Sequence, residues 1–171
     1  MSVYETIRSR GSIRRYKSDP IPEKELETVL DAARLAQSAA NRQPWQFIVV
    51  SEPSGKSALV SVAGHQSFVG DAAAVIVCLA DPDASAAVGP FSGFLIDSAI
   101  AIENMVLTAW ELGIGSCWIG AYNEAGVKQL LGVPDRMRVV SLLTLGYPAV
   151  GPGPKRRKAL KEIVHRERYG A

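Results

Sequence analysis

The longest apolar segment of the chain sets the first limit on what it can fold into. Residues Phe94–Leu112 read FLIDSAIAIENMVLTAWEL, and thirteen of these nineteen residues are apolar. Four polar residues recur at helical spacing and fall on one narrow stripe: Asp97, Asn104, Thr108 and Glu111. A helix that is apolar around most of its circumference is buried on more than one side. We therefore expect this helix to pack on a sheet and also on a second partner, which could be another copy of the chain.

Composition predicts a soluble, cytoplasmic, single-domain protein. Acidic residues recur along the 94–112 helix, and its uninterrupted apolar runs are too short for a membrane span. The net charge of +2 gives no general attraction to nucleic acid, and the polar, basic start is unlike a secretory signal. Cys78 and Cys117 stand in separate apolar stretches, which favours buried free thiols. The spacing of the two histidines indicates no metal site.

The other apolar patterns predict alternating helices and strands. We expect helices at 3–9, 23–35, 53–64 and 124–131, strands at 46–51, 72–80 and 138–146, and a strand or turn at 114–120. Residues 149–154 are rich in proline and glycine and read as a linker to the basic run KRRK at 155–158. The tail at 159–169 carries apolar side chains that need covering, so we expect it to lie on a surface, such as that of a partner chain.

A basic segment follows the first predicted helix. Its alternate residues would point the same way from an extended strand: Arg10, Ser12, Arg14 and Tyr16. A row of guanidinium groups with a hydroxyl suits a planar anion with several acceptors. A solvated basic face explains the same spacing, so both readings stay open.

The sequence carries partial matches to three nucleotide- or nucleic-acid-binding motifs. Gly113-Ile114-Gly115 begins like a dinucleotide fingerprint, but Trp118 stands where a third glycine is needed and the motif follows a helix. The GPGPKRRK run at 151–158 lacks the Ser/Thr and the following helix of a P-loop. Its four basic residues could form a nucleic-acid patch, although a solvated run or a phosphate clamp is the commoner use.

Four segments in order resemble the nitroreductase family of flavoproteins. They are Arg10-x-Ser12-x-Arg14-x-Tyr16 with Pro20-Ile21-Pro22, Ser38–Trp45 (SAANRQPW), Leu112–Gly120 (LGIGSCWIG), and Gly146-Tyr147-Pro148 with Lys155–Lys158. The resemblance runs roughly from Tyr4 to Tyr169. It implies an α+β fold with a mixed, mostly antiparallel central sheet flanked by helices, in an intertwined homodimer. It also implies non-covalent FMN at the subunit interface, and a single domain, 1–171, whose residues 149–171 form an arm packing on the partner.

The resemblance also assigns cofactor-binding residues. Arg10, Ser12 and Arg14 match a triplet that holds the phosphate and the polar edge of the flavin ring. Lys155 and Arg157 match a basic pair at the phosphate, with Arg156 as the alternate in an uncertain register. The implied loop from the other subunit is Ser38, Ala39 and Asn41, and the implied ring-face segment is Trp118, Ile119 and Gly120. Gln66 is the candidate at the pyrimidine side of the ring.

The activity implied is that of an FMN-dependent NAD(P)H oxidoreductase. Flavin N5 would do the chemistry, so no catalytic side chain and no metal are named. NAD(P)H and a small acceptor, such as a nitroaromatic or a quinone, would use one pocket in turn, giving ping-pong kinetics. The alternative is a flavin-binding or flavin-handling protein without NAD(P)H turnover.

Overall fold

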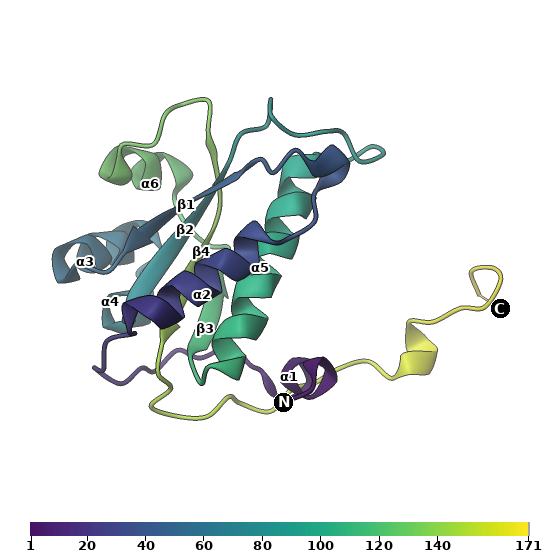
Figure 1. Ribbon diagram of the computed structural model, residues 1–171, viewed down its shortest axis with the longest axis horizontal. Helices are drawn as coiled ribbons and strands as arrows, with labels where there is room; N and C mark the ends of the chain where they lie inside the picture. The colour runs from purple at the N-terminus through teal and green to yellow at the C-terminus, as the bar shows by residue number, and fades with distance from the viewer. Residues whose placement is uncertain (171) are drawn as a thin grey trace.

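The centre of the protein is a four-stranded antiparallel sheet between two layers of helices (Figure 1). The computed structural model describes residues 1–170. Its strands are β1 (Trp45–Val50), β2 (Ala74–Ala80), β3 (Gly115–Ile119) and β4 (Arg138–Gly146), in the order β1-β2-β4-β3 across the sheet. All residues of β2 are buried, since it lies inside the sheet with helices over both faces. The architecture confirms the expected α+β fold.

Each face of the sheet has its own core. One face is covered by α2 (Glu23–Arg34) and α5 (Gly93–Glu111), and the other by α3 (Pro53–Val62), α4 (Phe68–Asp71) and α6 (Glu124–Leu131). Successive side chains of a strand point to opposite faces. Ile76 and Cys78 therefore join the core below α5, whereas Val75 and Val77 join the other. Both cysteines are free and buried, as the sequence predicted.

The predicted elements occur with their ends shifted by up to two residues, and the 114–120 segment is strand β3. The helix expected at 53–64 ends at Val62, because Gly64 and His65 both adopt positive φ. Three short elements were not predicted: α4 and the 3₁₀ turns η1 (Ala39–Asn41) and η2 (Leu160–Glu162). Each spans only three or four residues, which is too short for hydrophobic periodicity to register.

The polar stripe of α5 faces inward at Asp97 and is half-buried at Asn104, whereas Glu111 at its end is exposed. Asp97 is 2% exposed and accepts a hydrogen bond from the Ala39 N–H at 3.0 Å. Asn104 donates to the Ala32 carbonyl at 3.1 Å. These side chains satisfy backbone groups at the end of α2 and in the loop after it, while apolar Leu95 and Ile96 stay 48% and 37% exposed. The helix is thus polar where it meets these backbone groups, and part of its outward face, at Leu95 and Ile96, is apolar.

α5 is the one described helix whose length and apolar content would also suit a membrane span. Half of that stretch is buried inside the protein, and the helix contacts α2 and all four strands. Its apolar character is accounted for largely by this packing.

Two segments from opposite ends of the sequence, residues 10–16 and 147–157, meet beside β3. After α1 (Val3–Ser9), the chain forms a parallel bridge with this edge strand, in which the Ile13 N–H donates to the Ser116 carbonyl at 2.8 Å. After β4 the chain returns, and the Ala149 N–H donates to the Arg15 carbonyl at 2.9 Å. From there it passes over Gly11 and leaves the body as an extended arm (Figure 1).

Candidate active site

The two meeting segments enclose a strongly basic cavity of about 230 Å³, here called the cationic cavity. Its lining is Arg10, Gly11, Ser12 and Arg14 from one segment and Gly153, Pro154, Lys155, Arg156 and Arg157 from the other. A second cavity of about 170 Å³, the Trp118 cavity, shares three of these residues and continues to Glu103, Val106, Ser116 and Trp118. The two cavities form one elongated site along the edge of β3.

The cations of this site outnumber its acids, because Arg10, Arg14, Lys155, Arg156 and Arg157 line it with one carboxylate, Glu103. Burial and the neighbouring Arg10 and Arg157 lower the pKa of Lys155, in that order of size. The Lys155 Nζ donates to the Arg8 carbonyl at 2.6 Å. Arg10 Nε lies 3.8 Å from a Glu103 oxygen and is buried with no hydrogen-bond acceptor among the described residues. Buried polar groups usually have a partner. Such a donor set suits a doubly charged phosphate.

Gly11 allows the two segments to approach so closely. A Cβ at this position would overlap the Cβ of Pro152 and would lie 3.6 Å from Lys155 Cε. Gly115 allows a similar close approach between β3 and the segment that contains Ile13, because a Cβ on Gly115 would lie 2.6 Å from an Ile13 side-chain carbon. Two glycines thus bring the first segment against both β3 and the arm.

β3 offers its open edge to the site. The Ser116 carbonyl is bonded to Ile13, so the backbone groups of Ser116 and Trp118 point away from β4. Trp118 is 40% exposed, and a Cβ on Gly120 would meet open space. Ile119 is 2% exposed and its side chain belongs to the core. Trp118 can therefore present its backbone N–H to a ligand, Gly120 leaves open space beside it, and the Ile119 side chain is unavailable to a ligand.

Tyr16 departs from the alternating row that the sequence suggested. Its hydroxyl donates to the Ile13 carbonyl and shares a hydrogen bond with Thr144, both at 2.7 Å, and burial raises its pKa. The Tyr16 side chain is thereby tied to the sheet, whereas Arg10, Ser12 and Arg14 line the cationic cavity.

Burial also raises the pKa of Cys117, and Arg14 opposes that shift only in part. This thiol is therefore not activated as a nucleophile.

Ser38, Ala39 and Asn41 lie apart from the other predicted residues. Their loop is anchored to Asp97, six residues before Glu103 on α5, which is about 9 Å along the axis. None of the three lines the cationic or the Trp118 cavity of this chain. Ala40, Asn41 and Gln43 all have positive φ near 50°, a rare conformation for such residues that presents Asn41 to solvent.

Gln66 lies near the far end of β3. Its side-chain amide donates to the Ala63 carbonyl at 2.9 Å within its own turn. That turn packs beside the residues that follow β3, because a Cβ on Gly64 would lie 3.4 Å from the Ala121 carbonyl oxygen. Gln66 is thus close to Gly120 but lines neither cavity of the site.

Comparison with known proteins agrees with this geometry. A family model described as the nitroreductase family matches residues 7–63 and 52–147. The chain belongs to the nitroreductase family. As a member of this family, the protein is an oxidoreductase.

Solved structures of similar proteins cover nearly the whole chain. A nitroreductase family protein from Clostridium novyi is 37% identical, with a TM-score of 0.83 and 86% of each chain covered. One from Clostridium difficile is 32% identical, with a TM-score of 0.88, covering 98% of this chain and 99% of the other. The NADPH:FMN oxidoreductase from Vibrio harveyi, solved with NAD⁺, is 28% identical, with a TM-score of 0.89, covering 99% and 78%.

Within this nitroreductase-family fold, two site residues had not been singled out from the sequence. Glu103 is far from Arg10 along the chain, so no short motif could join them, although it is the one charged residue of α5 that is neither buried nor in the last turn. Gly11 stands inside the Arg10–Arg14 segment, but its use depends on Pro152. Only the folded chain brings these positions together.

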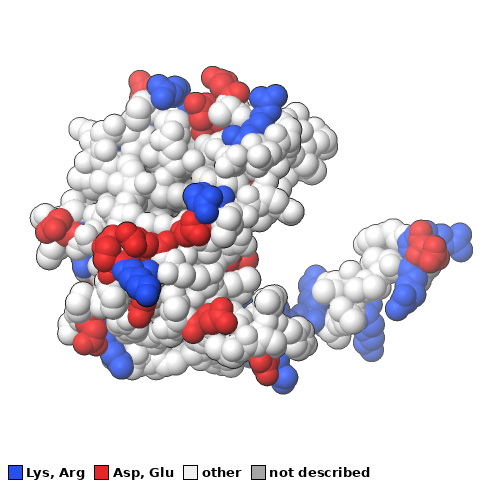
Figure 2. Space-filling view, viewed as in Figure 1, with Lys and Arg blue, Asp and Glu red and all other residues white. Residues whose placement is uncertain are grey.

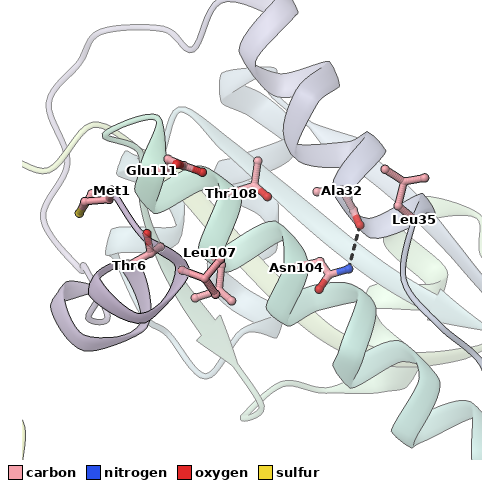
Figure 3. A pocket seen from close by; sticks show the side chains of 9 residues that line it. Met1, Thr6, Ala32, Leu35, Asn104, Leu107, Thr108 and Glu111 are labelled. Atoms are coloured by element: carbon pink, nitrogen blue, oxygen red, sulfur yellow. Dashed lines mark hydrogen bonds between the residues drawn. The ribbon is translucent and has the colours of Figure 1, made fainter.

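A larger groove of about 300 Å³ lies elsewhere, between α1, α2 and α5 (Figure 3). Its lining is mostly apolar, including Val3, Leu35 and Leu107, and Glu111 is the one charged side chain among its lining residues. Figure 3 shows Asn104 bridging its wall to Ala32. It contains none of the residues matched to the family motifs, so we do not assign the cofactor to it.

Proposed function

We propose that this protein is an FMN-dependent oxidoreductase that takes hydride from NAD(P)H and reduces a nitroaromatic, a quinone or another small electron-poor acceptor. The observation that most supports this proposal is the cationic cavity beside the open edge of β3. Bound flavin would accept hydride at N5 and pass its electrons on. Family membership and the NAD⁺ complex of the Vibrio harveyi relative support this proposal. Because both thiols are free, we place the protein in the cytoplasm.

The chain's residues fit the parts of FMN. Arg10, Lys155 and Arg157 would hold the phosphate, with Arg156 on the same wall. Ser12 links the cationic cavity to the Trp118 cavity, and Arg14 provides positive charge that favours an anionic ring. Backbone N–H groups at the open edge near Trp118 can donate to the ring without a side-chain acid. Gln66, at the end of β3, would reach the pyrimidine side after leaving its own turn.

No side chain of the site is proposed as an acid or a base. The residues bind, orient and provide charge, and one exposed ring face would serve the nicotinamide and then the acceptor. This arrangement predicts ping-pong kinetics. Initial rates measured at several acceptor concentrations should give parallel double-reciprocal plots, and intersecting plots would contradict a single shared pocket.

The colour of the purified protein tests the cofactor. We expect a yellow protein that releases FMN on denaturation and whose bound flavin bleaches on anaerobic mixing with NADH or NADPH. Bound flavin that stays oxidised with both nucleotides would favour the flavin-handling alternative. Release of FAD, or failure to bind FMN after reconstitution, would refute the proposal.

We further propose a homodimer in which two chains complete each site. The outward face of α5 is apolar, with Leu95 and Ile96 partly exposed, and burying such a face in a dimer stabilises it. The arm, residues 149–171, would pack on the partner; its Leu160, Ile163 and Val164 are 73%, 57% and 46% exposed. Figure 2 shows mostly basic side chains along this arm, with acidic ones near its end, and side chains of both charges on the near face of the body. Ala171 lies outside the described residues.

Mixed dimers test the shared site. Asn41 lines neither the cationic nor the Trp118 cavity of its own chain, so we propose that the Ser38–Asn41 loop serves the partner's flavin. Arg10→Glu and Asn41→Trp homodimers should both bind FMN poorly. A mixed dimer, isolated with two affinity tags, should regain about one flavin because one site collects both lesions. A mixed dimer as empty as its parents, or a monomer that keeps its flavin, would refute the shared site.

A further inference from the structure

Glu103 forms part of the wall of the Trp118 cavity, and no motif in the sequence assigned it a role. Its carboxylate lies 3.8 Å from Arg10 Nε, reaching across from the middle of α5. We propose that Glu103 is a positioning residue that holds the Arg10 guanidinium at the cationic cavity, ready for the phosphate of the cofactor. This inference rests on the proposed FMN-binding function.

The charges around Arg10 make such a residue necessary. Arg10 lies close enough to Lys155 to lower that lysine's pKa, and Arg157 acts on the lysine in the same direction. Like charges at such separations repel each other, and Arg10 has a long, flexible side chain. Among residues 1–170, Glu103 is the one acid that lines either cavity. Its attraction opposes the repulsion that would otherwise drive Arg10 out towards solvent.

The geometry of the pair leaves Arg10 free to bind. At 3.8 Å the contact is an ion pair, but it is too long for a hydrogen bond. Glu103 therefore attracts the guanidinium without using its N–H donors, and Arg10 Nε remains buried with no acceptor among the described residues. A guanidinium that keeps its donors can still contact a phosphate with two parallel hydrogen bonds.

The position of Glu103 on α5 suits this role. The helix is 19 residues long and its other faces pack on α2 and the sheet, so the carboxylate is carried by a rigid element. The same contact could also weaken phosphate binding, because the Glu103 carboxylate would repel a phosphate placed near it. The two readings predict opposite effects of removing the charge.

The experiment measures affinity for FMN and for riboflavin, which lacks the phosphate. Apo-protein is titrated by flavin fluorescence for the wild type, Glu103→Gln, Arg10→Gln and the double variant. We expect Glu103→Gln to weaken FMN binding about tenfold, to change riboflavin affinity less than about twofold, and to have no further effect when Arg10 is already glutamine. Glu111→Gln, two turns along α5, is the matched control and should bind like the wild type.

Four results would overturn the inference: unchanged FMN affinity, tighter FMN binding, equal losses for FMN and riboflavin, or equal losses in both Arg10 backgrounds. Glutamine keeps the shape of glutamate, and thermal melting checks that each variant is folded. A wild type that binds no FMN would overturn the proposed function as well, whereas FMN binding that is indifferent to Glu103 would overturn only this inference.

Discussion

Replacing Gly11 with alanine should weaken cofactor binding without removing any charge. The added methyl group would overlap Pro152 Cβ, which is attached to the backbone and cannot rotate away. The arm must then move out by roughly an ångström to restore an ordinary carbon–carbon contact of about 3.5–4.0 Å. Lys155 follows Pro152 by three residues and would move with it.

The expected magnitude follows from the contact that this shift disturbs. A hydrogen bond to a charged group contributes about 1.5–3 kcal/mol. Losing one such contact between Lys155 and the phosphate corresponds to roughly ten- to hundredfold weaker FMN binding, since about 1.4 kcal/mol is a factor of ten. The core should be unaffected, because Gly11 packs on the arm and not on either hydrophobic cluster.

The assay is a fluorescence titration of apo-protein with FMN, repeated at several salt concentrations. Gly151→Ala is the matched control, because a Cβ there meets nothing within 4 Å and the residue belongs to the same segment. We expect the control to bind as the wild type does, and Gly11→Ala to show a weaker salt dependence together with its lower affinity.

Equal FMN affinities of Gly11→Ala and the wild type would show that the arm does not form the phosphate site as described. A large fall in melting temperature of the apo-protein would also contradict the reasoning, since it would mean that the substitution disturbs the fold before the site.

Three further predictions concern other parts of the molecule. Converting both Lys155 and Arg157 to glutamate should weaken FMN binding at least about tenfold in the same titration, and unchanged affinity would refute the assigned register. Tyr16→Phe removes the hydroxyl bonded to Thr144, so the free energy of unfolding should fall by about 1–2 kcal/mol in a denaturant titration. Burial raises the pKa of Cys78 to about 12, above its unfolded value of about 8.5, so the folded chain retains the proton and stability measured by melting should decline as the pH rises above about 9.

The sequence predicted those parts of the fold that depend on local pattern. The apolar run 74–80 and the periodicity of 94–112 identify β2 and α5 because burial on both faces, or around most of a helix, leaves a signal in consecutive residues. The helix predicted at 124–131 also begins at a local signal, because the Asn123 side chain before it accepts from the Gly126 N–H at 3.2 Å.

The site was only partly predictable, because its residues come from separate elements. The basic run at 155–158 is visible in the sequence, but its contact with Arg10 depends on the close approach that Gly11 permits. The sequence showed the polar stripe from Asp97 to Glu111, yet the use of Asp97 and Asn104 against the backbone of α2 and the loop after it depends on the neighbouring helix. Glu103 could not be joined to Arg10 by spacing, since ion pairs between distant segments leave no local pattern.

The meeting of residues 10–14 with residues 153–157 has a consequence for how the protein acquires its cofactor. The first segment is held by β3 and the second begins where β4 ends, so neither is in place until both strands have paired. The proposed FMN cofactor would then bind only to the finished fold and would not nucleate it. Its stabilising effect comes by mass action on the native state and grows with the logarithm of free flavin. Cells short of flavin would hold a folded but less stable pool of the protein, and each molecule could be activated later without refolding.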